Sequence, residues 1–372
     1  MSMQRTYLDH NASSPLRPEA REAILAALEA TGNPSSVHAE GRRARAIVEA
    51  AREAVAALVS ARPEDVVFTS GGTEACHAVI AAGWDTIALA PVEHAAVTAP
   101  TQRSGAMIVT LDVSSDGIVD LAGLDRLGQA TGRTLLALQL ANNETGVLQP
   151  EVDAAARAAG SMMFSDVTQA AGKIPVDLTR LGADALALSA HKLGGPKGVG
   201  ALVLRTGFAL GVEMQRGGQE RGRRAGTENV AGIAGFGAAA RAALRDLADR
   251  DRIAALRDRL ASAVRALTPE VVVIGEAAPR LPNTVSLSWP RAKSETLVMA
   301  LDLEGVAVSA GAACASGKVG SSTTLEAMGL SAAIRDSAIR VSLGWSTTPE
   351  DIDRFLAAWA RVSERLEQRR AA

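Results

Sequence analysis

The chain has 372 residues, of which 47% are hydrophobic, enough apolar material for two compact cores. Its 39 Lys and Arg residues nearly balance its 41 Asp and Glu residues, and a net charge of −2 argues against a nucleic-acid-binding surface. No apolar run reaches the roughly 18 residues of a membrane-spanning helix, and the first residues lack the pattern of a secretory signal. The two cysteines form no disulfide framework, so we expect a cytoplasmic protein with reduced thiols.

Short apolar strands alternate with helices over the first part of the chain. Helical runs are predicted at Arg42–Leu58 and Glu74–Ala82. The predicted strands are Val66–Thr69, Thr86–Leu89, Ala106–Leu111, Thr134–Leu140, Ser161–Asp166, Ala185–Ser189 and Gly200–Leu204. This alternation is typical of an α/β fold, in which a mostly parallel sheet is covered by helices on both faces. Ligands of such sheets bind at the C-terminal ends of the strands.

A different pattern follows a long helical stretch from about Val230 to Leu267. The predicted elements there are strands at Val271–Ile274, Asn283–Ser288 and Ile339–Leu343, a helix near Ser294–Leu303, and a final helix from Pro349 to about Glu367. We therefore expect a large domain of residues 13–250 and a smaller α+β domain of residues 251–372, which residues 1–12 join.

A lysine follows the predicted strand Ala185–Ser189, in the run Ser189-Ala190-His191-Lys192 that ends in two glycines. The amine of a lysine at a buried strand end can form a Schiff base with a carbonyl once desolvation or nearby cations lower its pKa. A single lysine in such a place is more often an ordinary surface residue. Residues at the neighbouring strand ends favour the catalytic interpretation of Lys192 over the surface-residue one.

Two other strand ends carry groups that suit a phosphorylated cofactor. Asp166 ends a strand and can face the ring nitrogen of pyridoxal phosphate, while Gln169 can reach its ring hydroxyl. The Gly71-Gly72-Thr73 turn precedes an Ala-rich helix, whose N-terminal amides are a seat for phosphate. Taken singly, these are also common caps and turns. Neither a dinucleotide fingerprint nor a P-loop is present.

Together the motifs resemble the cysteine desulfurases of the NifS/IscS group, within the class V (fold type I) pyridoxal-phosphate-dependent aminotransferase family. The matching segments run almost end to end. They include Tyr7–Pro15, Asn33–His38, Gly41–Arg45, Gly71–Thr73, Glu93–Val97, Asn142–Gly146, Asp166–Lys173, Ser189–Lys192, Gly217–Asn229, Ser309–Lys318 and Ile339–Gly344. The resemblance implies the fold type I architecture, with a seven-stranded large-domain sheet, and pyridoxal 5'-phosphate as the cofactor.

The resemblance also implies a role for each site residue. Lys192 would carry the cofactor, and His94 would lie against its ring and assist proton transfer. The other implied cofactor residues are Gly72, Thr73, Asn143, Asp166, Gln169, Ser189, His191 and, from the second copy of a homodimer, Thr227 of the partner subunit. Arg340, with Asn143, would bind the carboxylate of an amino-acid substrate.

Cys314 lies in a segment of about residues 309–322 that is rich in Gly, Ala and Ser. From composition alone this is either a surface loop with an incidental thiol or a carrier for a thiol that travels between substrate and acceptor. The family's persulfide cysteine corresponds to Cys314. Cys76 lies early in a helix, and we interpret it as a packing residue. The histidine spacing predicts no metal site.

The implied reaction removes sulfur from L-cysteine, giving L-alanine and a persulfide on Cys314. A sulfur-acceptor protein, such as an iron–sulfur cluster scaffold, would then take the sulfur. The alternatives are a selenocysteine lyase, a class V aminotransferase, and a non-enzymatic interaction platform. Trp345, where the family often has Arg, and Cys76-His77, in place of an Asn-rich pair, are departures from the family pattern. The short C-terminus favours a NifS-like over an IscS-like member.

Overall fold

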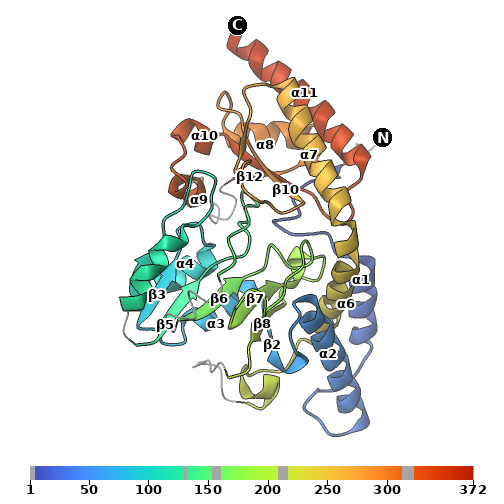
Figure 1. The fold of residues 1–372 in the computed structure, drawn as a ribbon. Helices are drawn as coiled ribbons and strands as arrows, with labels where there is room; N and C mark the ends of the chain where they lie inside the picture. Colours follow the sequence, from blue (N-terminus) through green and yellow to red (C-terminus); the bar gives the residue numbers. More distant parts are fainter. Residues whose placement is uncertain (1–4, 130–131, 153–160, 208–216, 312–321, 372) are drawn as a thin grey trace.

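The computed structural model describes residues 5–129, 132–152, 161–207, 217–311 and 322–371 (Figure 1). The described strands form three sheets, of seven, four and two strands. The seven-stranded sheet has the order β2-β8-β7-β6-β5-β3-β4, and the four-stranded sheet has the order β12-β13-β10-β9. Within the described residues, the ten α-helices α1–α4 and α6–α11 are Pro18–Leu28, Ala39–Leu58, Gly72–Ile80, Ala95–Thr101, Val230–Asp246, Arg250–Leu267, Ser294–Leu303, Thr323–Ala327, Ala332–Asp336 and Pro349–Ala371.

The large sheet contains the strands that the sequence predicts, with ends that differ by at most a few residues. They are β2 (Val66–Thr69), β3 (Thr86–Leu89), β4 (Met107–Thr110), β5 (Thr134–Ala137), β6 (Met162–Asp166), β7 (Ala185–Ser189) and β8 (Gly200–Leu204). Strand β8 runs antiparallel to both of its neighbours, and the other pairs are parallel. The expectation of a mostly parallel seven-stranded α/β sheet is confirmed.

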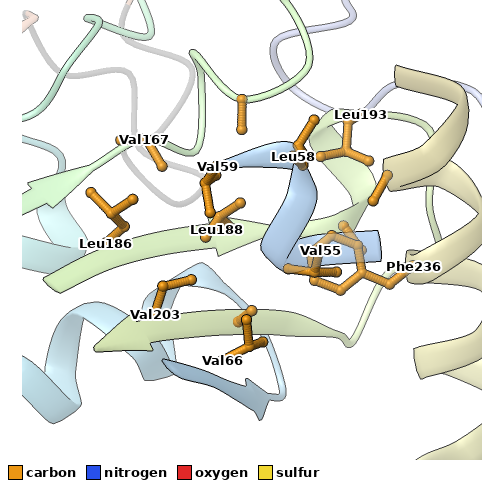
Figure 2. Packing of buried hydrophobic residues seen from close by; sticks show 14 of the residues in the cluster. Val55, Leu58, Val59, Val66, Val167, Leu186, Leu188, Leu193, Val203 and Phe236 are labelled. Atoms are coloured by element: carbon orange, nitrogen blue, oxygen red, sulfur yellow. The ribbon is translucent and has the colours of Figure 1, made fainter. Parts of the chain in front are cut away.

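Successive side chains of the central strands pack on opposite faces of this sheet. In β7, Leu186 and Leu188 join a core that includes residues of α2 and α6, whereas Ala185 and Ala187 join a core that includes residues of α3 and α4. Figure 2 shows the first of these cores, in which Phe236 of α6 lies beside Val55 of α2. The period of two in a fully apolar strand fits burial on both faces.

The second part of the chain builds its own sheet and core. Strands β9 (Val272–Ile274), β10 (Thr284–Ser288), β12 (Ser309–Ala310) and β13 (Ala338–Ser342) pair antiparallel. The N-terminal strand β1 (Thr6–Tyr7) pairs parallel with β11 (Val306–Ala307). Leu8 packs in the core formed by α7, α8, α11 and these strands. The N-terminal residues therefore lie with the C-terminal part of the chain (Figure 1).

The long helical stretch predicted from Val230 to Leu267 is interrupted. A turn of 3₁₀-helix at Leu247–Asp249 separates α6 from α7. Helix α6 packs on the large sheet with α1 and α2, and α7 packs against α11 and β10. The change of direction lets one helical run serve two cores. None of the described helices is both long and apolar enough to cross a membrane.

A buried ion pair joins α2, β2 and the segment after residue 216. Arg52 donates to both carboxylate oxygens of Glu220, at 2.7 and 2.9 Å, and Glu220 also accepts from the N–H of Phe68 at 2.8 Å. Glu220 and Arg221 have left-handed backbones, with φ of 47° and 57°, which side-chain-bearing residues adopt at a cost. The ion pair holds this strained turn against the sheet.

We expect Glu220→Ala to lower the free energy of unfolding by about 3–5 kcal/mol, because it leaves the buried Arg52 guanidinium without its counter-charge. The change is measured as a shift of the urea midpoint. The matched control is Glu19→Ala, which breaks an exposed pair with Arg245 and should cost at most about 1 kcal/mol. Equal shifts for the two variants would contradict the expectation.

Candidate active site

A cavity of about 130 Å³ lies at one edge of the large sheet. It brings together all but one of the residues predicted to bind a cofactor. These are Gly72, Thr73, His94, Asn143, Asp166, Gln169, Ser189, His191 and Lys192. Three further residues of interest, Cys76, Gln139 and Thr168, also line it.

The strand order explains why residues so far apart in the sequence meet here. Strands β2, β3, β5, β6 and β7 all run in the same direction, so their C-terminal ends share one edge of the sheet. Gly72 follows β2, His94 follows β3, Asn143 follows β5, and Asp166 and Ser189 end β6 and β7. The site is thus a set of strand-end residues, as expected for a doubly covered sheet.

One end of the cavity is built to hold an anion. Helix α3 begins there at Gly72, and its N-cap residue Gly71 offers no side-chain hydrogen bond to the first turn. A Cβ atom on Gly200 would lie 2.5 Å from the backbone of Gly71, so glycine is required for this close approach. Free amides at a helix N-terminus, beside the Ser189 hydroxyl and the His191 ring, suit a phosphate group.

The other end of the cavity is acidic. Asp166 accepts from the N–H of Thr168 at 2.9 Å, and the Cys76 sulfur lies 3.9 Å from its second oxygen. Burial, with the charge of Asp166, raises the pKa of the Cys76 thiol and the pKa of the Glu93 carboxyl well above their usual values. No Lys, Arg or His forms an ion pair with Asp166 in the described ranges. A cationic ring nitrogen would supply the missing counter-charge.

The donor set therefore fits pyridoxal phosphate at both ends. The N-terminus of α3 forms an anion-binding site, the anion seat, which matches the cofactor phosphate. The Asp166 carboxylate, which has no counter-charge among the described residues, matches the ring nitrogen. Between them lies an amine, that of Lys192, which can bond to the aldehyde carbon. The described ranges hold no cluster of three or more His, Cys, Asp or Glu residues able to bind a metal ion.

The Lys192 amine is held by main-chain oxygens of the N-terminal segment. It donates to the carbonyl of Asn11 at 2.6 Å and to that of Ala12 at 3.0 Å. The amide nitrogen of Gln169 donates to the same Asn11 carbonyl at 3.0 Å. A second lysine, Lys173, is half-buried and donates to the side chains of Asn11 and Gln169 at 2.9 and 2.8 Å. Desolvation, with the charges of Lys192 and Arg340, lowers its pKa well below the usual value. Residue 11 thus joins both lysines to the cavity.

The surroundings of the two site histidines determine the tautomer of His94 and the charge of His191. The His94 Nδ1 accepts from the N–H of Ala96 at 3.1 Å and caps α4. A neutral His94 therefore carries its proton on Nε2. Burial, with the charges of Lys192 and Lys197, lowers the pKa of His191 to about 4, so this ring is neutral at physiological pH.

Arg340 lies beside the cavity, and its side chain is almost fully buried. Its guanidinium pairs with Asp9 at 2.8 Å and donates to the carbonyl of Asn143 at 3.0 Å. Its Nε is buried and has no hydrogen-bond partner in the described part of the chain. One donor of this buried guanidinium is therefore unsatisfied within the described residues, beside the cavity residue Asn143.

Besides Arg340, which contacts Asn143 but does not line the cavity, two predicted residues are not placed there. Thr227 is exposed and lines a separate hollow with Ser70 and Arg224. Cys314 lies outside the described residues, as do residues 312–321 around it.

The structure adds residues to which the sequence patterns gave no role. Asn11 and Lys173 fall inside segments that resemble the family, but contacts across more than 150 residues of sequence cannot be read from those segments. Cys76 is buried, as a packing residue would be, but its thiol also contacts Asp166 in the cavity. The only signal for Cys76 is its place one turn after the Gly-Gly turn, on the same helix as the anion seat.

Comparison with known proteins gives one consistent result. The family model for aminotransferase class-V matches residues 6–355. The chain is 41% identical to a cysteine desulfurase of Cereibacter sphaeroides, over 98% of this chain and 97% of that one. It is 38% identical to the cysteine desulfurase IscS of Dictyoglomus turgidum, over 98% and 95% of the two chains. Its fold is similar to that of a NifS-like protein from Rickettsia africae, with a TM-score of 0.90, 30% identity, and coverage of 97% and 100%.

Proposed function

Because this chain belongs to the aminotransferase class-V family and is a pyridoxal-phosphate-dependent cysteine desulfurase by its full-length likeness to named members, we propose roles for its residues in that reaction. The observation that carries the assignment is the single cavity that joins an anion seat, an acid and the Lys192 amine. We assign the cofactor phosphate to Gly72, Thr73, Ser189 and His191. We assign its ring to His94, Asn143, Asp166 and Gln169.

Bound pyridoxal phosphate draws electrons from the Cα and Cβ atoms of an attached amino acid and so weakens the bond from Cβ to sulfur. The protein residues do the rest. Asp166 keeps the ring nitrogen protonated, and Lys192 Nζ takes the Cα proton of L-cysteine. Arg340 and Asn143, which are joined by a hydrogen bond, hold the substrate carboxylate.

Cys314 is the proposed sulfur acceptor. Its thiolate attacks the sulfur of the bound cysteine, so one S–S bond forms as the Cβ–S bond breaks. The carbon skeleton takes up the electron pair of that bond and a proton, and leaves as L-alanine. The sulfur is oxidised and Cβ is reduced to the same extent, so the step needs no external oxidant or reductant. The persulfide on Cys314 is the product that a second protein consumes.

The proposed homodimer accounts for Thr227. This residue is exposed and lies apart from the cavity of its own chain. We assign it to the phosphate of the other subunit, so that each cofactor site is completed by Thr227 of the partner subunit. Two ion pairs support a fixed position for its segment, namely Arg52 with Glu220 and Arg224 with Glu74.

We further propose a large domain of residues 13–250 and a small domain of residues 251–372 with residues 1–12. Separate sheets and separate cores support this division. A cytoplasmic location, where thiols stay reduced, suits a reaction that depends on a free thiol. The acceptor is an iron–sulfur cluster scaffold or another protein that takes persulfide sulfur.

The test is the product analysis of purified, cofactor-loaded protein given L-cysteine alone. We expect L-alanine in an amount equal to the persulfide formed in a single turnover, with the added sulfur atom found on Cys314 by mass spectrometry. An aminotransferase would yield a keto acid and no persulfide. Either the absence of alanine or a stoichiometric keto acid would refute the proposal.

A further inference from the structure

Two buried serines, Ser309 and Ser322, lie on either side of Cys314 in the sequence. Ser309 belongs to β12, and Ser322 is the N-cap of α9, where its oxygen accepts from the N–H of Leu325 at 3.0 Å. Cys314 is three residues beyond Gly311, so chain length alone keeps the two Cα atoms within about 11 Å of each other. The placement of these ends therefore limits where the Cys314 thiol can act.

The first end is fixed to the N-terminal segment. The Ser309 hydroxyl donates to Asp9 at 2.7 Å, and the other oxygen of the same carboxylate pairs with Arg340 at 2.8 Å. Strand pairing sets up this contact, because Ser309 lies directly opposite Arg340 in the β12–β13 register and Asp9 bridges to Ser342 of β13. Asp9 is thus shared between the strand that leads to Cys314 and the arginine proposed to bind substrate.

The second end is fixed to the turn after β5. The Ser322 hydroxyl donates to Glu144 at 2.5 Å, and both side chains are buried. The turn is rigid, because the Asn142 side chain accepts from the N–H groups of both Glu144 and Thr145 at 2.9 Å. The same turn carries Asn143, which lines the cofactor cavity.

The two ends are also connected to each other. Arg340 donates to the carbonyl oxygen of Asn143 at 3.0 Å, next to Glu144 in the chain. A continuous path therefore runs from Ser309 through Asp9, Arg340 and the Asn143–Glu144 turn to Ser322. It passes through both residues proposed to bind the substrate carboxylate.

We propose that Asp9 and Glu144 are positioning residues for sulfur transfer, which fix both ends of the segment that carries Cys314 onto the substrate-binding residues Arg340 and Asn143. This inference rests on the proposed function. Transfer requires the thiol and the substrate sulfur to meet at about 3–3.5 Å, and a misplacement of about 1 Å can slow such a step about 100-fold. Hydrogen bonds at both ends supply this alignment without touching the substrate.

The experiment compares two variants that remove contacts of the path with two that keep them. Glu144→Met removes the hydrogen-bond partner of Ser322 and of Thr324 but leaves the helix cap, and Ser309→Ala removes the donor to Asp9 but leaves the Asp9–Arg340 pair. We expect each to slow single-turnover persulfide formation from L-cysteine by about ten-fold or more. Glu144→Gln, whose amide oxygen still accepts, and Ser322→Thr, which keeps the hydroxyl, should stay within about two-fold of wild type.

The matched control is Ser337→Ala, which removes a buried serine hydroxyl bonded to Ser288 and the Ala333 carbonyl, outside the path. Cofactor affinity, measured by absorbance titration of the apoprotein with pyridoxal phosphate, should change less than about two-fold in every variant, and the KM for cysteine should hold in Ser309→Ala. Persulfide formation in Glu144→Met or Ser309→Ala at the control rate would overturn the inference. The inference would also be overturned if weaker cofactor binding fully explained the slower persulfide formation.

Failure of the inference can be told apart from failure of the proposed function. The proposed function is tested by whether the wild-type protein forms a persulfide on Cys314. The inference concerns only the rate of that step in variants that retain Cys314, the cofactor and Lys192. If wild type forms the persulfide and Glu144→Met forms it equally fast, only the positioning role is lost.

Discussion

Lys192→Ala should abolish L-alanine formation, with a fall of at least about a thousand-fold, because the variant lacks both the amine that bonds to the cofactor and the base at the substrate Cα. It should also lose the covalent link to pyridoxal phosphate. After borohydride reduction and proteolysis, mass spectrometry should find the cofactor on the Lys192 peptide of wild type and on no peptide of the variant.

Two other lysines serve in this test, one as a control variant and one as a competing amine for the cofactor. Lys197 is exposed, and Lys197→Ala is the matched control that should keep both the label and the activity. Lys173 lies nearby, half-buried and with a lowered pKa, so it is the competing amine, but its hydrogen bonds go to the Asn11 and Gln169 side chains. Labelling of Lys173 in wild type would show that the cofactor lysine had been assigned wrongly.

Cys314→Ala should keep bound cofactor and its visible absorbance yet form no persulfide. Alanine formation should fall by at least about 100-fold, because a thiol from solution lacks the effective concentration of one held in the protein. The measurement pairs absorbance with mass spectrometry after one turnover of L-cysteine. Normal turnover in this variant would remove Cys314 from the reaction.

Cys76→Ala is the control for that experiment. The Cys76 thiol is buried, and burial together with Asp166 raises its pKa, so it stays protonated and unreactive at neutral pH. In folded protein an alkylating reagent should therefore modify Cys314 and leave Cys76 until the chain is unfolded. Sulfur found on Cys76 after turnover would contradict this division of roles.

The elements of the large sheet could be predicted from the sequence because each strand is a short apolar run with turn residues on both sides. The fully buried strands, such as β7 and β8, show no polar alternation, which itself indicates a sheet covered on both faces. The break between α6 and α7 could not be predicted, because both halves have helix-forming sequences. It arises from the packing of the two halves on different cores.

The cavity residues were predictable for a different reason. Asp166, Lys192 and the Gly71–Thr73 turn end or directly follow strands, and parallel strands bring their C-terminal ends to one edge whatever the loops between them. The roles of His94, Asn143 and His191 came from the resemblance to the family. The supporting contacts were not predictable. Asp9 and Arg340 are 331 positions apart, and Asn11 and Lys173 are 162 apart, so only the folded chain shows them as partners. The left-handed backbones of Glu220 and Arg221 were likewise not predictable, because the glycines of this segment lie beside these two positions and not at them.

The pairing of β1 with β11 has a consequence for folding during synthesis on the ribosome. Thr6 and Tyr7 are made about 300 residues before their partners, Val306 and Ala307. At usual elongation rates this delay is roughly 15 to 60 seconds. Meanwhile the neighbouring carbonyls that later hold Lys192 have no fixed place. The nascent large sheet can therefore assemble early, but a site competent for catalysis arises only after residues 306 and 307 have been made.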